Sequence, residues 1–192
     1  MRPLCCVMLV FGAVFGRVLE AQDRSRPLGV SLASGLSQPL GRMWGSTANP
    51  GFRLVAGVWV RPTRLERLSF RGDFSYDRSG LALGPFATAA NVSMATKVIG
   101  ASVSTLYQLA TPSSRFRPYV VGGLGMYEIK SITTEPRGSY ETGGQVGPGF
   151  HGGGGVETRL AGLNTFVEAR FQRNVIDGDR RTYVPLVFGI RF

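Results

Sequence analysis

From residue 27 to the final Phe192, apolar and polar side chains alternate in segments that are separated by clusters of glycine, proline, asparagine and serine. An alternation with a period of two is typical of β-strands whose two faces meet different environments. No helical period persists for more than about two turns after residue 26. We therefore predict an all-β chain with eight strands at 27–36, 52–61, 67–76, 96–109, 115–127, 146–158, 163–173 and 182–192.

The connections between these segments alternate in length. Short turns are expected around 62–66, 110–114 and 159–162, and longer segments follow the first, third and fifth strands. Short turns at one rim and long loops at the other are typical of an up-and-down antiparallel barrel, and a tilted strand of about ten residues crosses a bilayer. The prediction is an eight-stranded transmembrane barrel with both termini at the short-turn end.

The apolar faces of the strands indicate the surrounding solvent. Large apolar side chains continue to the strand ends, and aromatic residues lie near both predicted rims. Such aromatic girdles are typical of membrane interfaces. The residues concerned are Phe52, Tyr76 and Phe171 near the long loops, and Tyr107, Phe116 and Phe192 near the short turns. A soluble barrel that points its polar faces into water remains the alternative.

The polar faces carry charges that a lipid-bathed barrel would enclose. An isolated buried charge is very unfavourable, so enclosed charges must be paired or hydrogen-bonded. We expect a paired interior network that rigidifies the barrel, since eight strands leave room only for side chains. A path for ions or protons is the alternative. The residues are Arg71, Asp73, Glu157, Glu168 and Arg170.

Glycine residues favour the closure of a narrow barrel, whereas proline residues within the strands argue against it. The chain has 27 glycines, with runs in YVVGGLGMY (119–127) and GFHGGGGVE (149–157). Narrow barrels need small residues where strands curve and where large inward neighbours need room. Pro118, Pro148 and Pro185 argue against a closed sheet, because each should lose a ladder hydrogen bond or force a bulge.

Residues 1–21 have the pattern of a cleavable signal peptide. A basic start precedes an apolar core at 3–16, and Leu19-Glu20-Ala21 offers a cleavage site. A membrane-anchoring helix is the alternative. Both cysteines, Cys5 and Cys6, lie in this segment, so a mature chain of residues 22–192 would hold no disulfide. The formal net charge is +10 without any basic run longer than two residues, so no nucleic-acid partner is expected.

The barrel segment, residues 27–192, resembles the OmpA/OmpX-like family of small bacterial outer-membrane barrels. The resemblance rests on FRPYVVGGLGMY (116–127), GGGGVETRL (152–160), FVEARF (166–171) and the ending YVPLVFGIRF. It implies that Phe188, Ile190 and Phe192 form a C-terminal signal that the barrel-assembly machinery recognises. The family often has Tyr where this chain has Ile190. The same barrel serves as anchor, adhesin, channel and enzyme, so the resemblance does not fix an activity.

An enzymatic site would have to use His151, the single histidine. The sequence HGGG at 151–154 is similar to an oxyanion loop of lipases, but the G-x-S-x-G nucleophile motif is missing. Lipid A deacylases pair a histidine with a serine two residues away, where this chain has Gly149 and Gly153. We therefore expect no catalysis and no cofactor or metal.

Arginines gather on the predicted short-turn side, whereas the long loops are nearly neutral. Such a rim could meet anionic lipid headgroups, or it could consist of solvated basic turns. The arginines include Arg61, Arg64, Arg67, Arg115, Arg117, Arg159 and Arg191.

Together these patterns predict a monomeric protein of the bacterial outer membrane with both termini in the periplasm. Its expected partners are outer-membrane lipids and the assembly machinery. The expected role is structural or interaction-based: membrane integrity, adhesion or surface contact through the loops. A narrow passive channel for small solutes, a lipid A-modifying enzyme and a soluble ligand carrier are the alternatives, in that order.

Overall fold

The structure, a computed structural model, describes residues 27–40, 49–81, 92–111, 114–176 and 179–192. The predicted signal peptide at 1–21, with Cys5 and Cys6, lies outside the described residues. The described residues include no helix long and apolar enough to cross a membrane.

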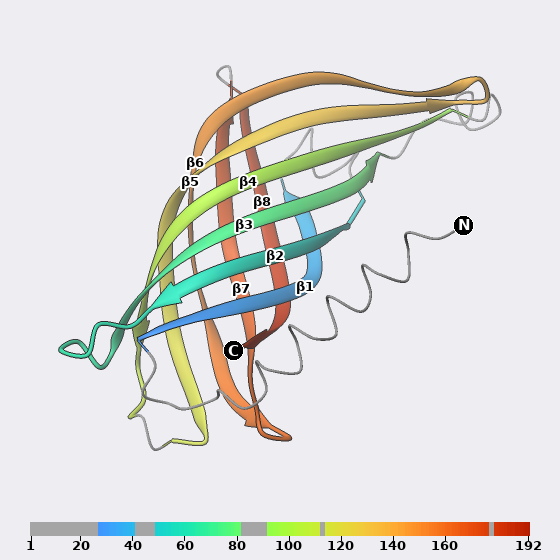
Figure 1. Cartoon of the computed structure of the whole chain (residues 1–192). Coiled ribbons are helices and arrows are strands. Elements are labelled where there is room, and N and C mark those ends of the chain that lie inside the picture. The colour runs from blue at the N-terminus through green and yellow to red at the C-terminus, as the bar shows by residue number, and fades with distance from the viewer. Residues whose placement is uncertain (1–26, 41–48, 82–91, 112–113, 177–178) are drawn as a thin grey trace, which may run out of the picture.

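Eight strands form one closed barrel in which each strand runs antiparallel to its sequence neighbours and β1 pairs with β8 (Figure 1). The expected eight-stranded up-and-down barrel is confirmed. The strands are β1 (Leu28–Leu40), β2 (Gly51–Val60), β3 (Leu68–Leu81), β4 (Ser93–Gln108), β5 (Phe116–Glu135), β6 (Gly138–Leu160), β7 (Leu163–Ile176) and β8 (Asp179–Arg191).

One end of the barrel, the short-turn end, carries three short connections, the start of β1 and the end of β8. The link from β6 to β7 is the two-residue turn Ala161–Gly162, whose φ angles of 48° and 85° are typical of a tight hairpin. The Phe192 N–H donates to the Val30 carbonyl at 2.8 Å, and the Val30 N–H donates to the Phe192 carbonyl at 3.1 Å. The first and last strands therefore meet at this end.

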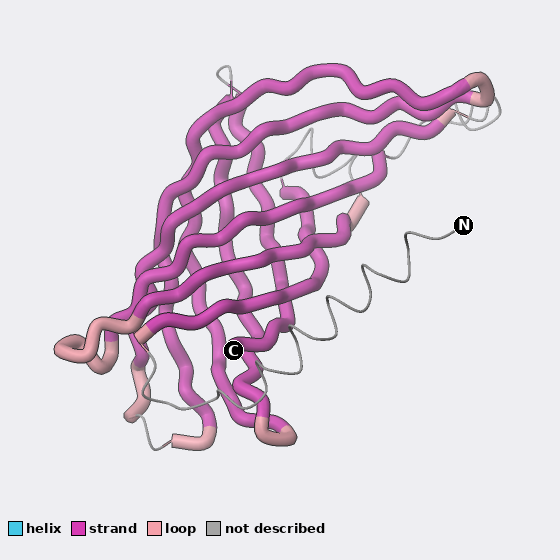
Figure 2. Tube along the Cα trace, viewed as in Figure 1, coloured by secondary structure: helices cyan, strands magenta, loops and turns pink. Residues whose placement is uncertain are grey.

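At the opposite end, the β5–β6 hairpin over residues 130–144 projects beyond the rest of the barrel wall (Figure 2). We call this segment the projecting sheet. The sequence predicted a long connection between the strands at 115–127 and 146–158, but β5 and β6 run through it as a ladder that turns at Pro136–Arg137. The register shifts after Ile129, which pairs with Gln145, because Gly143 and Gly144 take φ angles of 93° and 120°. Such angles favour glycine, so a glycine pair carries this bulge.

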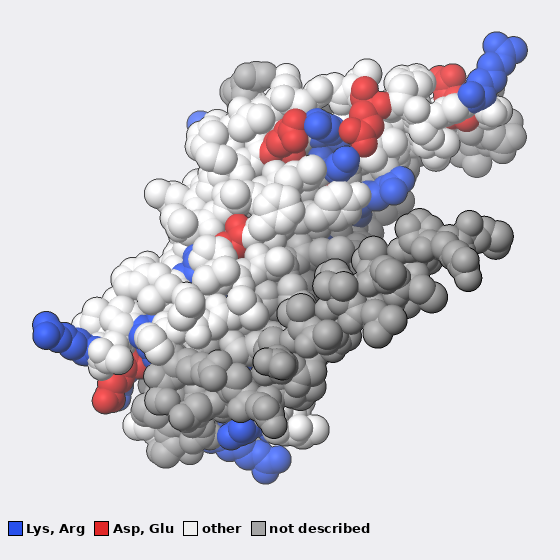
Figure 3. Space-filling model, viewed as in Figure 1, with Lys and Arg blue, Asp and Glu red and all other residues white. Residues whose placement is uncertain are grey.

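The outer surface of the barrel is apolar. Outward side chains along its middle are exposed, including Phe74 at 57%, Val103 at 69% and Leu124 at 66%. Charged side chains gather toward the two ends of the visible face, and the band between them is largely uncharged (Figure 3). A continuous apolar belt of this kind is unfavourable in water and is typical of a wall that faces lipid. The barrel is therefore a transmembrane one.

Small and large side chains complement each other inside. The buried rings of Tyr127, Tyr119 and Phe166 lie against glycines on adjacent strands. A Cβ atom at Gly100 would overlap the Tyr127 ring, and one at Gly189 would overlap the Phe166 ring. The glycines therefore make room for inward aromatic residues, as expected for a narrow barrel.

The three strand prolines are accommodated without opening the barrel. The β7–β8 ladder is interrupted between the pairs Ala169↔Leu186 and Gln172↔Tyr183, which flank Pro185, and then continues in the same register. Pro148 precedes Gly149, where β6 begins to pair with β7, so it needs no donor on that side. Pro118 lies near the start of β5 and still pairs with Val156. The expected loss of ladder contacts thus occurs at Pro185, and no register shift occurs at any of the three prolines.

Candidate functional site

A ring of four charged side chains crosses the middle of the barrel interior. We call it the central ring: Arg71 and Asp73 from β3, and Glu168 and Arg170 from β7. The Arg71 guanidinium donates to Asp73 Oδ2 at 3.0 Å and to both Glu168 carboxylate oxygens at 2.9 and 3.0 Å. Arg170 donates to the same two acidic groups, at 2.9 Å to Asp73 and 2.5 Å to Glu168. Two positive and two negative charges balance within the ring.

The central ring is sealed from solvent. Its side chains are at most 7% exposed, and the Glu168 side chain is fully buried. The Tyr119 hydroxyl donates a further hydrogen bond of 2.7 Å to Glu168 Oε2. The cavity beside the ring has a volume of about 10 Å³, which is close to the minimum that one water molecule needs. The ring therefore spans the interior from β3 to β7.

A second cluster lies nearer the short-turn end. Glu157 on β6 accepts a hydrogen bond of 2.9 Å from the Gln108 amide and forms an ion pair of 3.0 Å with Arg117. It also contacts Arg191, whose guanidinium lies 5.0 Å from the centre of the Phe166 ring. The sequence placed Glu157 with the other four charges, but the structure puts it in this separate group.

A third cluster lies toward the projecting sheet. The Arg53 guanidinium on β2 pairs with Asp77 on β3 at 3.2 Å and donates to the Gln172 side-chain carbonyl at 3.0 Å. Gln172 in turn donates to Asn174 Oδ1 at 3.2 Å. These side chains are buried, so charged and polar groups lie at three levels of the interior. Two clusters of buried apolar residues lie among them, one around Tyr127 and one around Leu106.

His151 lies inside the barrel, where its Nε2 is 2.8 Å from the Ser104 hydroxyl on β4. A serine and a histidine at this distance have the first contact of a nucleophile and base pair. Among the described residues, however, no group forms a hydrogen bond with His151 Nδ1, so no carboxylate of this part of the chain orients the ring as in a triad. Within the described residues, no group of three His, Cys, Asp or Glu side chains could hold a metal ion.

Sequence reasoning missed several members of these clusters, namely Arg53, Asp77, Tyr119, Gln172 and Arg191. It placed Arg191 on the basic rim of the short-turn side, yet the residue is 5% exposed and lies in the interior. The period-two pattern contained the signal: Arg53 alternates with outward Phe52 and Leu54, and Arg191 alternates with Ile190 and Phe192.

The three residues of the predicted C-terminal signal share the outer face of β8. Phe188 is 49% exposed toward lipid, whereas Ile190 and Phe192 are partly covered. Their place on the lipid face leaves the apolar pattern accessible, and recognition by the assembly machinery stays a prediction.

Comparison with known proteins supports the fold and no finer assignment. No protein-family model matches the sequence, and the curated proteins give no significant match. Among solved structures, the Neisserial surface protein A has a TM-score of 0.58 at 16% identity, over 86% of this chain and 96% of that one. The attachment invasion locus protein of Yersinia pestis has a TM-score of 0.55 at 14% identity, over 86% and 97%.

A major outer membrane protein from Thermus thermophilus has a TM-score of 0.56 at 14% identity, over 87% of this chain and 100% of that one. These three proteins share the barrel across nearly their whole length, although few residues are identical. The chain therefore has the fold of the small eight-stranded outer-membrane barrels.

Proposed function

We propose that the chain is a non-catalytic protein of the bacterial outer membrane that makes surface contacts through its projecting sheet. The observation that carries this proposal is the edge of β6. Residues 138–148 pair with β5 on one side, whereas pairing with β7 begins only at Gly149. Within the described part of the chain, no strand pairs with the other side of this segment. A free edge strand outside the membrane is a template for another extended segment.

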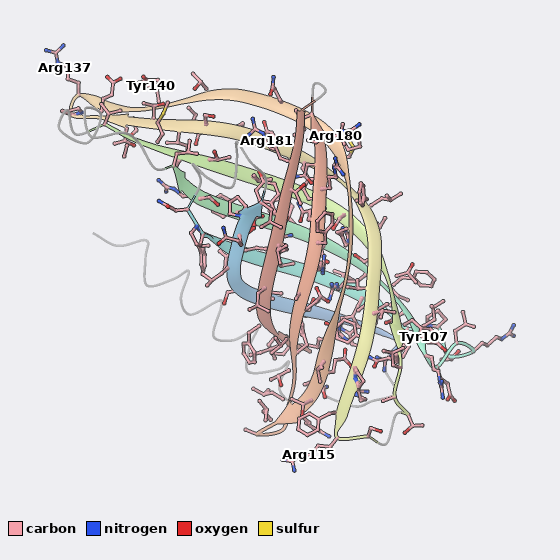
Figure 4. The ribbon with its side chains drawn as sticks, turned by 180° about the vertical axis from the view of Figure 1, so that it is seen from behind. Tyr107, Arg115, Arg137, Tyr140, Arg180 and Arg181 are labelled. Atoms are coloured by element: carbon pink, nitrogen blue, oxygen red, sulfur yellow. The ribbon has the colours of Figure 1, made fainter. Side chains whose placement is uncertain are left out.

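The projecting sheet is prepared for contact by its own cross-strand links. The Tyr140 hydroxyl donates to Glu135 at 2.9 Å, and Ser139 donates to Thr134 at 3.0 Å. Lys97 pairs with Glu141 at 3.1 Å. Arg137 and Tyr140 lie at the tip, far from the short-turn end (Figure 4). These links favour a stiff platform over a mobile loop, which lowers the entropic cost of binding.

The name of one similar protein also supports contact with surfaces. The Yersinia pestis structure is described as an attachment invasion locus protein. The passive-channel alternative is less well supported, because the central ring lies across the interior and its side chains are at most 7% exposed. The enzymatic alternative is disfavoured because Ser104 and His151 are buried inside the barrel, away from any lipid substrate.

The proposed orientation puts the projecting sheet outside the cell and the short turns in the periplasm, as in bacterial barrels generally. Single-cysteine variants test it, starting from a mature chain that lacks cysteine. An impermeant maleimide should label Arg137→Cys in intact cells and should label Arg64→Cys only after lysis. The reverse pattern would contradict the orientation.

Removing the projecting sheet should abolish the proposed surface contacts without damaging the barrel. The variant joins Ile129 to Gln145, which are directly paired, through an Asn-Gly turn. We expect unchanged refolding in lipid vesicles and reduced retention of expressing bacteria on an epithelial cell layer. A matched variant, Tyr140→Ser, keeps the edge and should retain most of the binding. Equal retention of truncated and full-length proteins would contradict the proposed role.

The C-terminal signal has its own test in Phe192→Ala. This change keeps the backbone hydrogen bonds to Val30 and removes only the aromatic ring. We expect nearly unchanged refolding in detergent, since the ring is partly exposed, and a marked fall in outer-membrane yield in cells. A parallel loss in both measurements would mean that the ring acts through barrel stability rather than through recognition.

A further inference from the structure

A groove on the outer wall near the short-turn end has no role in the surface contacts proposed above. It has a volume of about 470 Å³ and crosses β2 to β5. Its outward lining is almost entirely apolar and includes Val60, Phe70, Gly72, Val103, Gly122 and Leu124. Such a groove on a lipid-facing wall has the shape and polarity to hold an acyl chain.

Two glycines create the groove. A Cβ atom at Gly72 would meet nothing within 4 Å, and the nearest atom to one at Gly122 is the His151 carbonyl oxygen at 3.9 Å. Packing therefore does not require glycine at either position, in contrast to the inward glycines beside Tyr127 and Phe166. Because strand interiors disfavour glycine, an open site for a ligand is one of the recognised reasons for keeping it there.

Arg67 and Tyr107 border the groove at its short-turn end. Tyr107 is the next outward residue of β4 after Val103 and Thr105, and it is 42% exposed. The N–H of the next residue, Gln108, donates to the Arg67 carbonyl at 2.8 Å. This hydrogen bond brings exposed Arg67 next to the end of β4, where Tyr107 lies. The Arg115 guanidinium lies 5.9 Å from the ring of outward-facing Phe116, which is 61% exposed. Figure 4 shows Arg115 at the same end of the barrel but apart from Tyr107, so Arg115 adds to the positive charge of this end without bordering the groove.

The short-turn end has more positive than negative charge. Among the described residues from 61 to 67 and from 114 to 117, five arginines accompany one acidic residue, Glu66. Burial and, secondarily, repulsion from Arg117 lower the pKa of Arg61 in this region. A cationic, aromatic rim next to an apolar groove complements an anionic headgroup joined to an acyl chain.

We infer that this groove is a binding site for an anionic glycerophospholipid. One acyl chain lies over Gly72 and Gly122, and the phosphate lies against Arg67 and Tyr107. This site would hold a lipid of the inner leaflet of the outer membrane. The choice of leaflet rests on the orientation proposed above, in which the short-turn end faces the periplasm. Binding itself depends on the groove and the rim, and not on orientation.

Native mass spectrometry of the refolded mature protein tests the site. The protein is exposed to equal amounts of phosphatidylglycerol and phosphatidylcholine with identical chains. We expect preferential retention of phosphatidylglycerol. Replacing the rim arginine, in Arg67→Gln, should reduce its relative affinity by about fivefold. Gly72→Leu should fill the groove and reduce retention of both lipids.

Gly80→Leu is the matched control, since Gly80 faces outward on the same strand at the opposite end, and its Cβ atom would meet nothing closer than 3.9 Å. Its lipid retention should equal that of the wild type. Equal retention of the two lipids by the wild type would overturn the site, as would equal losses in Gly72→Leu and Gly80→Leu. Selective binding combined with reversed maleimide labelling would overturn only the inner-leaflet assignment.

Discussion

Glu168→Gln is expected to destabilise the barrel by about 3–5 kcal/mol. Glutamine keeps the size of the side chain but removes the negative charge that Arg71 and Arg170 share. Its amide group also presents donors to guanidinium groups that need acceptors. Two buried arginines would then face Asp73 alone. Urea titration of the protein in lipid vesicles, followed by tryptophan fluorescence, measures the change.

Two further variants separate charge balance from a general loss of packing. Glu128→Gln removes an acid from a partly exposed pair with Lys130 and should change stability by about 0–1 kcal/mol. The double variant Glu168→Gln, Arg170→Gln removes one charge of each sign from the central ring and should recover part of the loss. If the single and double variants are equally stable, charge balance in the ring is not what stabilises the barrel.

Phe74→Arg should cost about 2–4 kcal/mol, because it puts a charge on the outer wall near the middle of the bilayer. Phe74 is 57% exposed on the apolar belt. The same substitution at Phe116, which is 61% exposed at the short-turn end, should cost about 0–1 kcal/mol, since the side chain can reach the headgroups there. Unfolding in vesicles compares the two variants.

The contrast between these two positions is the informative result. Phe74 and Phe116 are similarly exposed and receive the same substitution, so their depth in the membrane is the main difference between them. A small effect at both positions would mean that the belt does not face lipid. A large effect at both would mean that the short-turn end lies deeper than the girdle of aromatic residues indicates.

The sequence predicted the barrel well wherever strands have two unlike faces. The alternation in 67–76 and 163–173 assigned inward and outward residues correctly, since lipid and interior impose opposite polarity on them. It failed between 127 and 146, where β5 and β6 continue as strands. Most residues of that segment are polar or glycine, so no polarity pattern distinguishes a strand from a loop there.

Alternation also identified the interior charges but not their partners. Arg71, Asp73, Glu168 and Arg170 meet because β3 and β7 face each other across the barrel, and Glu157 pairs instead with Arg117. Which residues share a level depends on the stagger of the strands, a property of barrel closure that the pattern of a single strand does not contain. For the same reason, Arg191 was expected at the rim although it lies inside.

The proposed closure of the interior by the central ring matters most for function, because it separates a contact protein from a channel. Single-channel recording of refolded residues 22–192 in planar bilayers tests it most directly. We predict no conductance steps above the bilayer baseline, either for the wild type or for the variant that lacks the projecting sheet. Reproducible, well-resolved steps from the wild-type protein would contradict a barrel closed by its central ring.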